Sequence, residues 1–388
     1  MRVFLRYSVA VAVFLLIGCP DAQKDIDSVK SAETLTDRFP KSPEPGKLVA
    51  YPPVPLFPSS EATDAPNLLS DPSFEVGLAY WEVSAPNAAE CYSFDTFCAD
   101  GKICCHLRSS TPGDVLVSQV VPVSPTTFYS FSALVFAPGG SMAEPQVQDM
   151  ASGNVVKGKP ARGPMDAWTP LSLTFITGRK TEKVTISVKC ADTDNNGPVL
   201  LDHCVLRMLP TDNLLPSGTM ESPPENGQMP EWYVHGKAAS PVSPGFGSDH
   251  ALELPALQGE NSSLYGLVLA HKSMAGRTVW VSAMVNMPPQ QASPRPEVTL
   301  MLRLADQKGQ YIRFSTTCPA TGEWEEVTLL ARIPEYEAPE TSDLPPFQTL
   351  LIERPPEVEG QVLIDDVAIF PIPGGNFDGG LVPAKSAP

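Results

Sequence analysis

Apolar and polar side chains alternate along short stretches of this chain, and loops rich in glycine, proline, asparagine and aspartate separate the stretches. Residues 115–123, 128–136 and 184–189 are examples in the first half, and 279–285 and 298–304 in the second. A period of two, rich in β-branched residues, predicts strands whose successive side chains face opposite sides of a sheet. No sustained helical period follows the apolar N-terminus. We therefore predict an all-β fold with about eight short strands in each half.

A set of five sequence anchors occurs twice in the same order. In the first half they are Asn67-Leu68-Leu69, Ser73-Phe74-Glu75 with Trp81, Ser132-Ala133-Leu134-Val135, Trp168 and Gly197 to Asp202; in the second they are Asn213-Leu214-Leu215, Thr219-Met220-Glu221 with Trp232, Ser282-Ala283-Met284-Val285, Trp324 and Gly360 to Asp365. Five anchors in one order indicate an internal repeat. Since each copy holds enough strands for two facing sheets, we predict two tandem antiparallel β-sandwich domains, at residues 66–209 and 210–373.

The first 18 residues have the three zones of a cleavable secretion signal. Arg2 and Arg6 precede an apolar run at residues 9–17, and Gly18 precedes Cys19. The apolar run is about half of the ~20 residues that a membrane-spanning helix needs, so an uncleaved membrane anchor is the weaker alternative.

The residues around the predicted cleavage site, Leu16-Ile17-Gly18-Cys19, resemble the lipobox of bacterial lipoproteins. The resemblance implies cleavage before Cys19, attachment of diacylglycerol and of acyl chains such as palmitate to this residue, and tethering to a lipid bilayer. Pro20, rather than aspartate, follows the cysteine, which in the enterobacterial sorting pattern implies the outer membrane. We expect a lipoprotein of the cell envelope, facing either the periplasm or the cell surface.

Composition changes at both ends of the repeat. Residues 19–65 are rich in proline, serine, lysine and acidic side chains, with too few apolar ones to order the backbone, and we predict a disordered linker. Residues 374–388 have a similar composition, and we expect a loose tail. The chain carries a formal net charge of −17, which repels nucleic acid and argues against it as a partner.

The opening Asn-Leu-Leu, Phe-Glu and Trp anchors, with the closing Val362-Leu363-Ile364-Asp365-Asp366-Val367, resemble the galactose-binding-like jelly roll of carbohydrate-binding modules. The resemblance covers both copies and implies a jelly-roll fold for each. It also implies a structural calcium between the start and the end of the fold, since carboxylates suit a hard cation. The matching acids are Glu75 with Asp202, and Glu221 with Asp365. In the alternative interpretation these acids bind the backbone of neighbouring loops.

Trp280 has no aromatic counterpart in the first copy, where Ser130 aligns. On a strand, Val279 and Val281 face one side and Trp280 faces the other. If the two valines are in the core, Trp280 is exposed and its ring is a platform for a sugar. The alternative is that a loop buries it.

Seven cysteines follow Cys19, and export permits disulfides. Cys190 and Cys204 lie symmetrically about Gly197 in a predicted hairpin, and we expect a bond between them. The other four in the first copy are Cys91, Cys98, Cys104 and Cys105. They are predicted to form two bridges of undetermined pairing, with a zinc site as the competing interpretation. Cys318, in the second copy, is either a buried thiol or a link to another chain.

The chain shows no nucleophile elbow, zinc-protease motif or phosphate loop, so we predict a protein that is not an enzyme. Two functions remain: an interaction or adhesion scaffold that binds envelope proteins, and a glycan-binding lipoprotein. A face lined with exposed aromatic residues would favour glycan, whereas apolar sheet faces or an exposed Cys318 would favour assembly. Because aromatic residues make up only 8% of the chain and many lie on repeat anchors, the sequence favours the scaffold.

Overall fold

The computed structural model describes residues 65–84, 89–93, 97–108, 113–215, 218–221, 229–234, 237–267, 276–291, 296–305, 311–333, 348–373 and 378–381. Within these ranges the chain forms strands and one four-residue helix, α3 (Thr193–Asn196). None of the helical structure in this part is long and apolar enough to cross a membrane. The signal, Cys19 and the linker up to residue 64 lie outside the described residues, and their assignment stays a prediction.

The strands of the first half are β1 (Glu82–Val83), β2 (Ala89–Ser93), β3 (Ile103–Leu107), β4 (Val115–Pro122), β5 (Phe128–Phe136), β6 (Met142–Asp149), β7 (Val155–Lys157), β8 (Ala161–Arg162), β9 (Thr169–Thr177), β10 (Lys183–Ala191) and β11 (Val199–Leu209). The strands of the second half are β12 (Met229–Val234), β13 (Lys237–Ala239), β14 (Pro241–Val242), β15 (Ala251–Leu254), β16 (Ser262–Leu267), β17 (Thr278–Asn286), β18 (Thr299–Ala305), β19 (Tyr311–Thr317), β20 (Trp324–Arg332), β21 (Gln348–Arg354), β22 (Val362–Pro371) and β23 (Gly379–Leu381).

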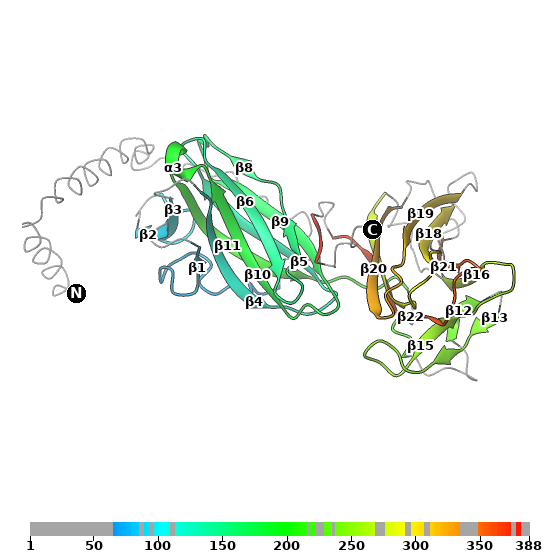
Figure 1. The fold of residues 1–388 in the computed structure, drawn as a ribbon. Coiled ribbons are helices and arrows are strands. Elements are labelled where there is room, and N and C mark those ends of the chain that lie inside the picture. The colour runs from blue at the N-terminus through cyan, green and yellow to red at the C-terminus, as the bar shows by residue number, and fades with distance from the viewer. Residues whose placement is uncertain are drawn as a thin grey trace, which may run out of the picture.

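The first domain is a sandwich of two sheets (Figure 1). Sheet A has the order β1-β4-β10-β6-β7, with β8 also paired to β6, and sheet B has the order β2-β3-β11-β5-β9-β23. Its core contains Val117 and Ile186 from sheet A and Phe131 and Leu173 from sheet B, all essentially inaccessible to water. Burial alternates along β4 as the sequence pattern predicts, because every second side chain faces the opposite sheet.

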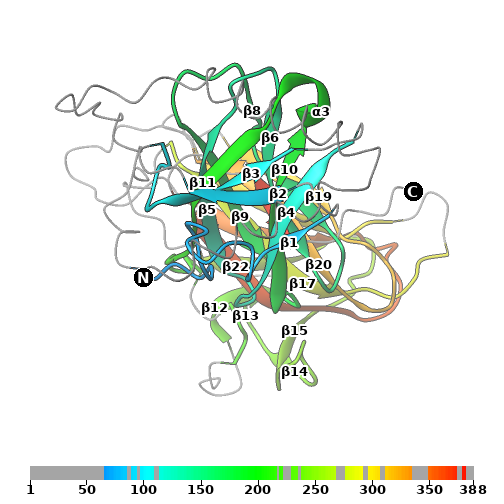
Figure 2. The same ribbon diagram turned by 90° about the vertical axis from the view of Figure 1, so that its left-hand side faces the viewer.

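The second domain repeats this architecture. Sheet D has the order β13-β12-β16-β21-β18-β19, and sheet E has the order β14-β15-β22-β17-β20. Leu264 and Ile352 of sheet D pack against Val281 and Ile364 of sheet E in a second core. The prediction of two tandem β-sandwiches is therefore confirmed. In the view of Figure 2 the first domain lies in front, and β12 to β15 extend below it.

A third apolar cluster joins the two domains. Phe128, Ile176 and Leu209 lie in the first domain, on the face of sheet B that points away from its core. They pack against residues of the second domain, Trp280 and Ile372, with Phe370 at the edge of the cluster. Burial of such side chains contributes about 1.5–3 kcal/mol each when it is complete. The two domains therefore pack against each other through a shared apolar interface.

Arg179, in the turn between β9 and β10, reaches across this interface. Its side chain is 3% exposed and donates to the carboxylate and the backbone carbonyl of Asp366. It also donates to Ser282 Oγ at 3.0 Å, and its Nε lies 3.8 Å from Glu326 Oε1. Burial raises the pKa of Glu326, and Arg179 opposes that rise. One guanidinium thus compensates the acidic groups of the second domain that the interface removes from water.

The C-terminal tail also returns to the first domain, so the prediction of a loose tail is wrong for residues 378–381. β23 pairs in parallel with β9, and the Asp378 carboxylate accepts a hydrogen bond from the backbone N–H of Thr174 at 2.8 Å. Gly380 lies against the ring of Trp280, where a Cβ would overlap the indole. Composition alone missed this strand because an open sheet edge supplies most of its bonding partners.

Candidate functional site

The two acids that the calcium prediction named in the first domain hold one loop by its backbone. Glu75 Oε1 accepts hydrogen bonds from the N–H groups of Lys102 at 2.7 Å and Ile103 at 2.9 Å. Asp202 Oδ2 accepts from the N–H of Asp100 at 2.8 Å. The loop leads directly into β3, so the acids fix where that strand begins beside β11.

The second domain repeats this arrangement. Asp365 Oδ2 accepts hydrogen bonds from the N–H of Phe246 at 2.6 Å and from Ser248 Oγ at 2.7 Å. Glu221 Oε1 accepts from the N–H of His250 at 3.1 Å. This loop leads into β15, which pairs with β22 as β3 pairs with β11.

A calcium ion needs six to eight oxygen ligands, and the four acids do not fit that requirement. Their carboxylates face N–H and O–H donors, and the described residues contain no group of three or more histidine, cysteine, aspartate or glutamate side chains able to hold a metal ion. Removal of these carboxylates from water outweighs the hydrogen bonds that they accept. Burial therefore raises the pKa of Asp202 to about 6, and it also raises the pKa of Asp365. The structure thus agrees with the alternative interpretation, in which the acids bind loop backbone.

Trp280 is not an exposed platform. Val279 and Val281 are in the core and Trp280 faces the other side, as the alternation predicts. That other side is covered, however, and only 5% of Trp280 is accessible. The first domain and Gly380 cover it, which a pattern local to one strand cannot reveal.

The predicted bond between Cys190 and Cys204 is also absent. Both are fully buried thiols in the first core, and burial raises their pKa values. The segment between them is not a hairpin, because β10 belongs to sheet A and β11 to sheet B, with α3 crossing from one sheet to the other.

The remaining cysteines are only partly placed. Cys105 faces the main core, whereas Cys104 faces the opposite side of β3, where it packs near Trp168. Cys98 packs at the edge of the same small apolar cluster as Cys104 and Trp168. The backbone of Cys91 is paired opposite Cys105, but its side chain is outside the described residues, so the pairing among these four stays a prediction. Cys318 is 3% exposed and packs in the second core.

A row of aromatic and apolar side chains crosses sheet D on the face that points away from the core. Trp232 and Leu264 face the core, so Tyr233 and Tyr265, which are cross-strand partners, share the opposite face. Gly266 allows this arrangement, because the Trp232 ring lies directly against it on the core side. The register extends the row from Tyr265 through Leu351 and Met301, which are only 3% and 9% exposed, to Ser315.

Polar side chains flank this tyrosine row on both sides. Along the strands the next outward-facing positions are Ser263, Glu353, Thr299 and Thr317 on one side, and Thr349, Arg303 and Arg313 on the other. Thr349 is 1% exposed, and among the described residues its Oγ1 has no hydrogen-bond partner. Strands lie about 4.8 Å apart, so a row over five strands is roughly 19 Å long.

This face was missed in the sequence although a signal for it exists. Trp232-Tyr233-Val234 and Leu264-Tyr265-Gly266 each place one tyrosine opposite core residues, which is the reasoning that we applied only to Trp280. Nothing in the sequence, however, pairs the two tyrosines, because register between strands distant in sequence comes from the fold.

Ser73, Asp100 and His203 form the most reactive-looking polar cluster, but not a catalytic triad. Ser73 Oγ donates to Asp100 Oδ2 at 2.6 Å, and His203 Nδ1 lies 3.1 Å from the same oxygen. The hydrogen bond from Ser73, followed by that from His203, lowers the pKa of Asp100. A triad needs the base to bind the nucleophile, whereas here both bind the acid.

No protein-family model matches the sequence, and no curated protein matches it. Solved structures do match. The tandem of two family 22 carbohydrate-binding modules from Paenibacillus barcinonensis is 17% identical with a TM-score of 0.33, over 81% of this chain and 100% of that one. A family 61 carbohydrate-binding module solved with β-1,4-galactotriose is 19% identical with a TM-score of 0.33, over 37% of this chain and 99% of that one.

An enzyme is also among the similar structures. An arabinose-bound α-L-arabinofuranosidase is 15% identical with a TM-score of 0.30, over 38% of this chain but only 26% of that one. At these identities and TM-scores we transfer no ligand or activity to this chain.

Proposed function

We propose that this protein is a non-catalytic glycan-binding protein, and that its second domain binds the glycan across the outward face of sheet D. The observation that carries the proposal is the cross-strand pair Tyr233 and Tyr265, flanked by polar rows. A sugar ring has an apolar face that stacks on an aromatic ring and hydroxyl groups that need hydrogen-bond partners at its edge.

The flanking rows supply both kinds of partner. Arg303 and Arg313 donate, and Glu353 accepts.

Two features would favour an interaction scaffold, an exposed apolar sheet face and an exposed Cys318. In this structure both are buried by other parts of the same chain. Apolar residues on the outward face of sheet B, such as Phe128 and Ile176, are covered by the second domain. Cys318 is buried and so is unsuited to linking two chains. These observations favour glycan binding over the scaffold that composition favoured.

The test is a glycan array followed by calorimetry with the captured oligosaccharide, using the chain without its first 19 residues. Tyr265→Ala and Tyr233→Ala are each expected to weaken binding about tenfold or more, equivalent to ~1.4 kcal/mol. Tyr80→Ala is the matched control, because Tyr80 is 57% exposed in the first domain. If no glycan binds, or if both variants bind as tightly as the control, the proposal is wrong.

We further propose that Cys19 is acylated and tethers the protein to the cell envelope, on the support of the lipobox resemblance. Labelling with a palmitate analogue should disappear in Cys19→Ser. Labelling that persists in this variant would contradict the anchor without affecting the glycan proposal.

A further inference from the structure

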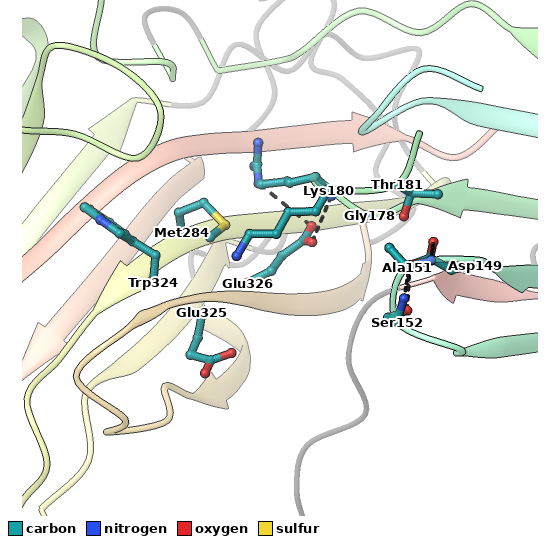
Figure 3. A pocket seen from close by; sticks show the side chains of 11 residues that line it. Asp149, Ala151, Ser152, Gly178, Lys180, Thr181, Met284, Trp324, Glu325 and Glu326 are labelled. Carbon is teal, nitrogen blue, oxygen red and sulfur yellow. Dashed lines mark hydrogen bonds and ion pairs between the residues drawn. The ribbon is translucent and has the colours of Figure 1, made fainter. Parts of the chain in front are cut away.

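A cavity of about 190 Å³ lies where the two domains meet (Figure 3). Figure 3 shows Trp324 and Met284 of the second domain at one end and Asp149, Ala151 and Ser152 of the first domain at the other, with Lys180 and Glu326 between them. The cavity exists only because the domains are docked, since neither contributes a complete wall.

The size of the cavity restricts its ligand. Water occupies ~30 Å³ per molecule in the liquid, so this space equals about six waters. Pockets for drug-sized ligands begin at ~300 Å³. The cavity therefore suits one small ring rather than a chain or a nucleotide.

One end of the cavity is an aromatic and apolar surface. The half-buried Trp324 ring is held by the edge of Phe246, with ring centroids 6.0 Å apart and an interplanar angle of 60°. Met284, which is 1% exposed, continues this surface. A fixed indole face binds a flat apolar surface at little cost in conformational entropy.

The remainder of the lining offers both donors and acceptors. The Lys180 ammonium lies 5.5 Å from the centre of the Phe246 ring, and no carboxylate among the described residues forms an ion pair with it. Ser152 Oγ donates to Asp149 Oδ2 at 2.5 Å, and its oxygen can still accept. Glu326, on the same face of β20 as Trp324, brings its carboxylate to the middle of the cavity, 3.8 Å from Arg179 Nε.

We propose that this cavity is a second ligand site, which binds one neutral saccharide ring stacked on Trp324. A phosphate or carboxylate would face the Glu326 carboxylate, and an organic cation would face Lys180 and Arg179. A neutral polyhydroxylated ring avoids both conflicts, because its hydroxyls can donate to Glu326 and accept from Lys180. Since both domains line the site, bound sugar also stabilises their docking.

The experiment uses glucose, galactose, xylose and N-acetylglucosamine as probes, followed by saturation-transfer NMR. The protein is the chain without its first 19 residues and with Tyr233→Ala and Tyr265→Ala, so that the tyrosine row does not contribute. At least one sugar is expected to bind saturably and to raise the melting temperature. Trp324→Ala and Lys180→Ala should each weaken this binding about tenfold or more.

Lys157→Ala is the matched control, because Lys157 is similarly exposed and pairs with Glu144 outside the cavity. Lys180 is an exposed side chain, so its removal tests the site even if Trp324→Ala folds poorly. The proposal is overturned if none of the four sugars binds saturably, or if Lys180→Ala binds as tightly as Lys157→Ala. Neither result bears on the tyrosine row, which is tested separately.

Discussion

The outward faces of sheet A and sheet D differ although the two sheets occupy the same place in their domains. Sheet A presents small, polar and charged side chains, among them Ser187, Glu144 and Gln146, and Glu144 bonds both Gln146 and Lys157. Sheet D presents the tyrosine row. The acids that hold the loops before β3 and β15 are, by contrast, the same in both domains. Positions that close the sandwich thus agree between the copies, whereas positions that face outward are free to differ.

The other pair of sheets differs in what covers it. Part of the outward face of sheet B, at Phe128, Ile176 and Leu209, lies against the second domain, and the outward face of sheet E supplies Trp280 and Met284 to the same junction. The comparison indicates a division of roles: two faces contribute to the junction, one face is polar, and one carries the proposed glycan site.

The largest effect is expected at the junction, from Arg179→Ala. The substitution leaves Glu326 buried without its counter-charge, and breaking a buried pair in this way costs about 3–5 kcal/mol. Scanning calorimetry should show the docked protein separating into two transitions. Arg162→Ala is the control, because its pair with Asp192 is exposed and should contribute less than about 1 kcal/mol. Equal effects of the two substitutions would contradict the role given to Arg179.

A smaller effect is expected from pH, through Asp202. Its folded pKa of about 6 lies above the ~3.9 of an unfolded aspartate, so between these values the folded state holds a proton that the unfolded state has released. The free energy of unfolding of the first domain should therefore fall as pH rises from about 4 to 6, by up to ~3 kcal/mol. Urea titrations at several pH values measure it. The slope should flatten in Asp202→Asn and persist in a control at the exposed Asp192; a slope unchanged in both rules out this residue as its source.

Removing a core thiol should cost less. Cys190→Ala is expected to lower the stability of the first domain by about 1 kcal/mol through lost packing, with or without reductant. Cys318→Ala should act on the second domain instead, since Cys318 packs in that core. Urea midpoints in the presence and absence of dithiothreitol separate the cases. If dithiothreitol lowers the urea midpoint of the wild type but not that of Cys190→Ala, Cys190 forms the disulfide that the sequence predicted.

The smallest effect is expected from the tail. A chain ending at Pro373 loses β23 and the cover that Gly380 gives to Trp280, so Trp280 fluorescence should shift to the red and the junction should weaken by about 1 kcal/mol. A chain ending at Leu381 keeps the strand and serves as the control. If both chains show the wild-type emission maximum, the tail strand does not cover Trp280.

The sequence by itself determined the strands, the repeat and the cores. Alternation along β4 and β17 predicts which side chains point inward, because the pleat of a strand is a local property of the backbone. The acids Glu75 and Asp202 were also found from the repeat, and their partners in the structure are backbone N–H groups.

Only the tertiary structure decided whether the outward face of each sheet is covered by another part of the chain. Trp280 and Tyr265 both lie on the outward side of a strand, yet the first is buried at the junction and the second belongs to the tyrosine row. The pattern within a strand distinguishes its two sides but not what lies beyond them. That depends on how the domains dock, through contacts such as Phe128 with Phe370, between residues more than 200 positions apart.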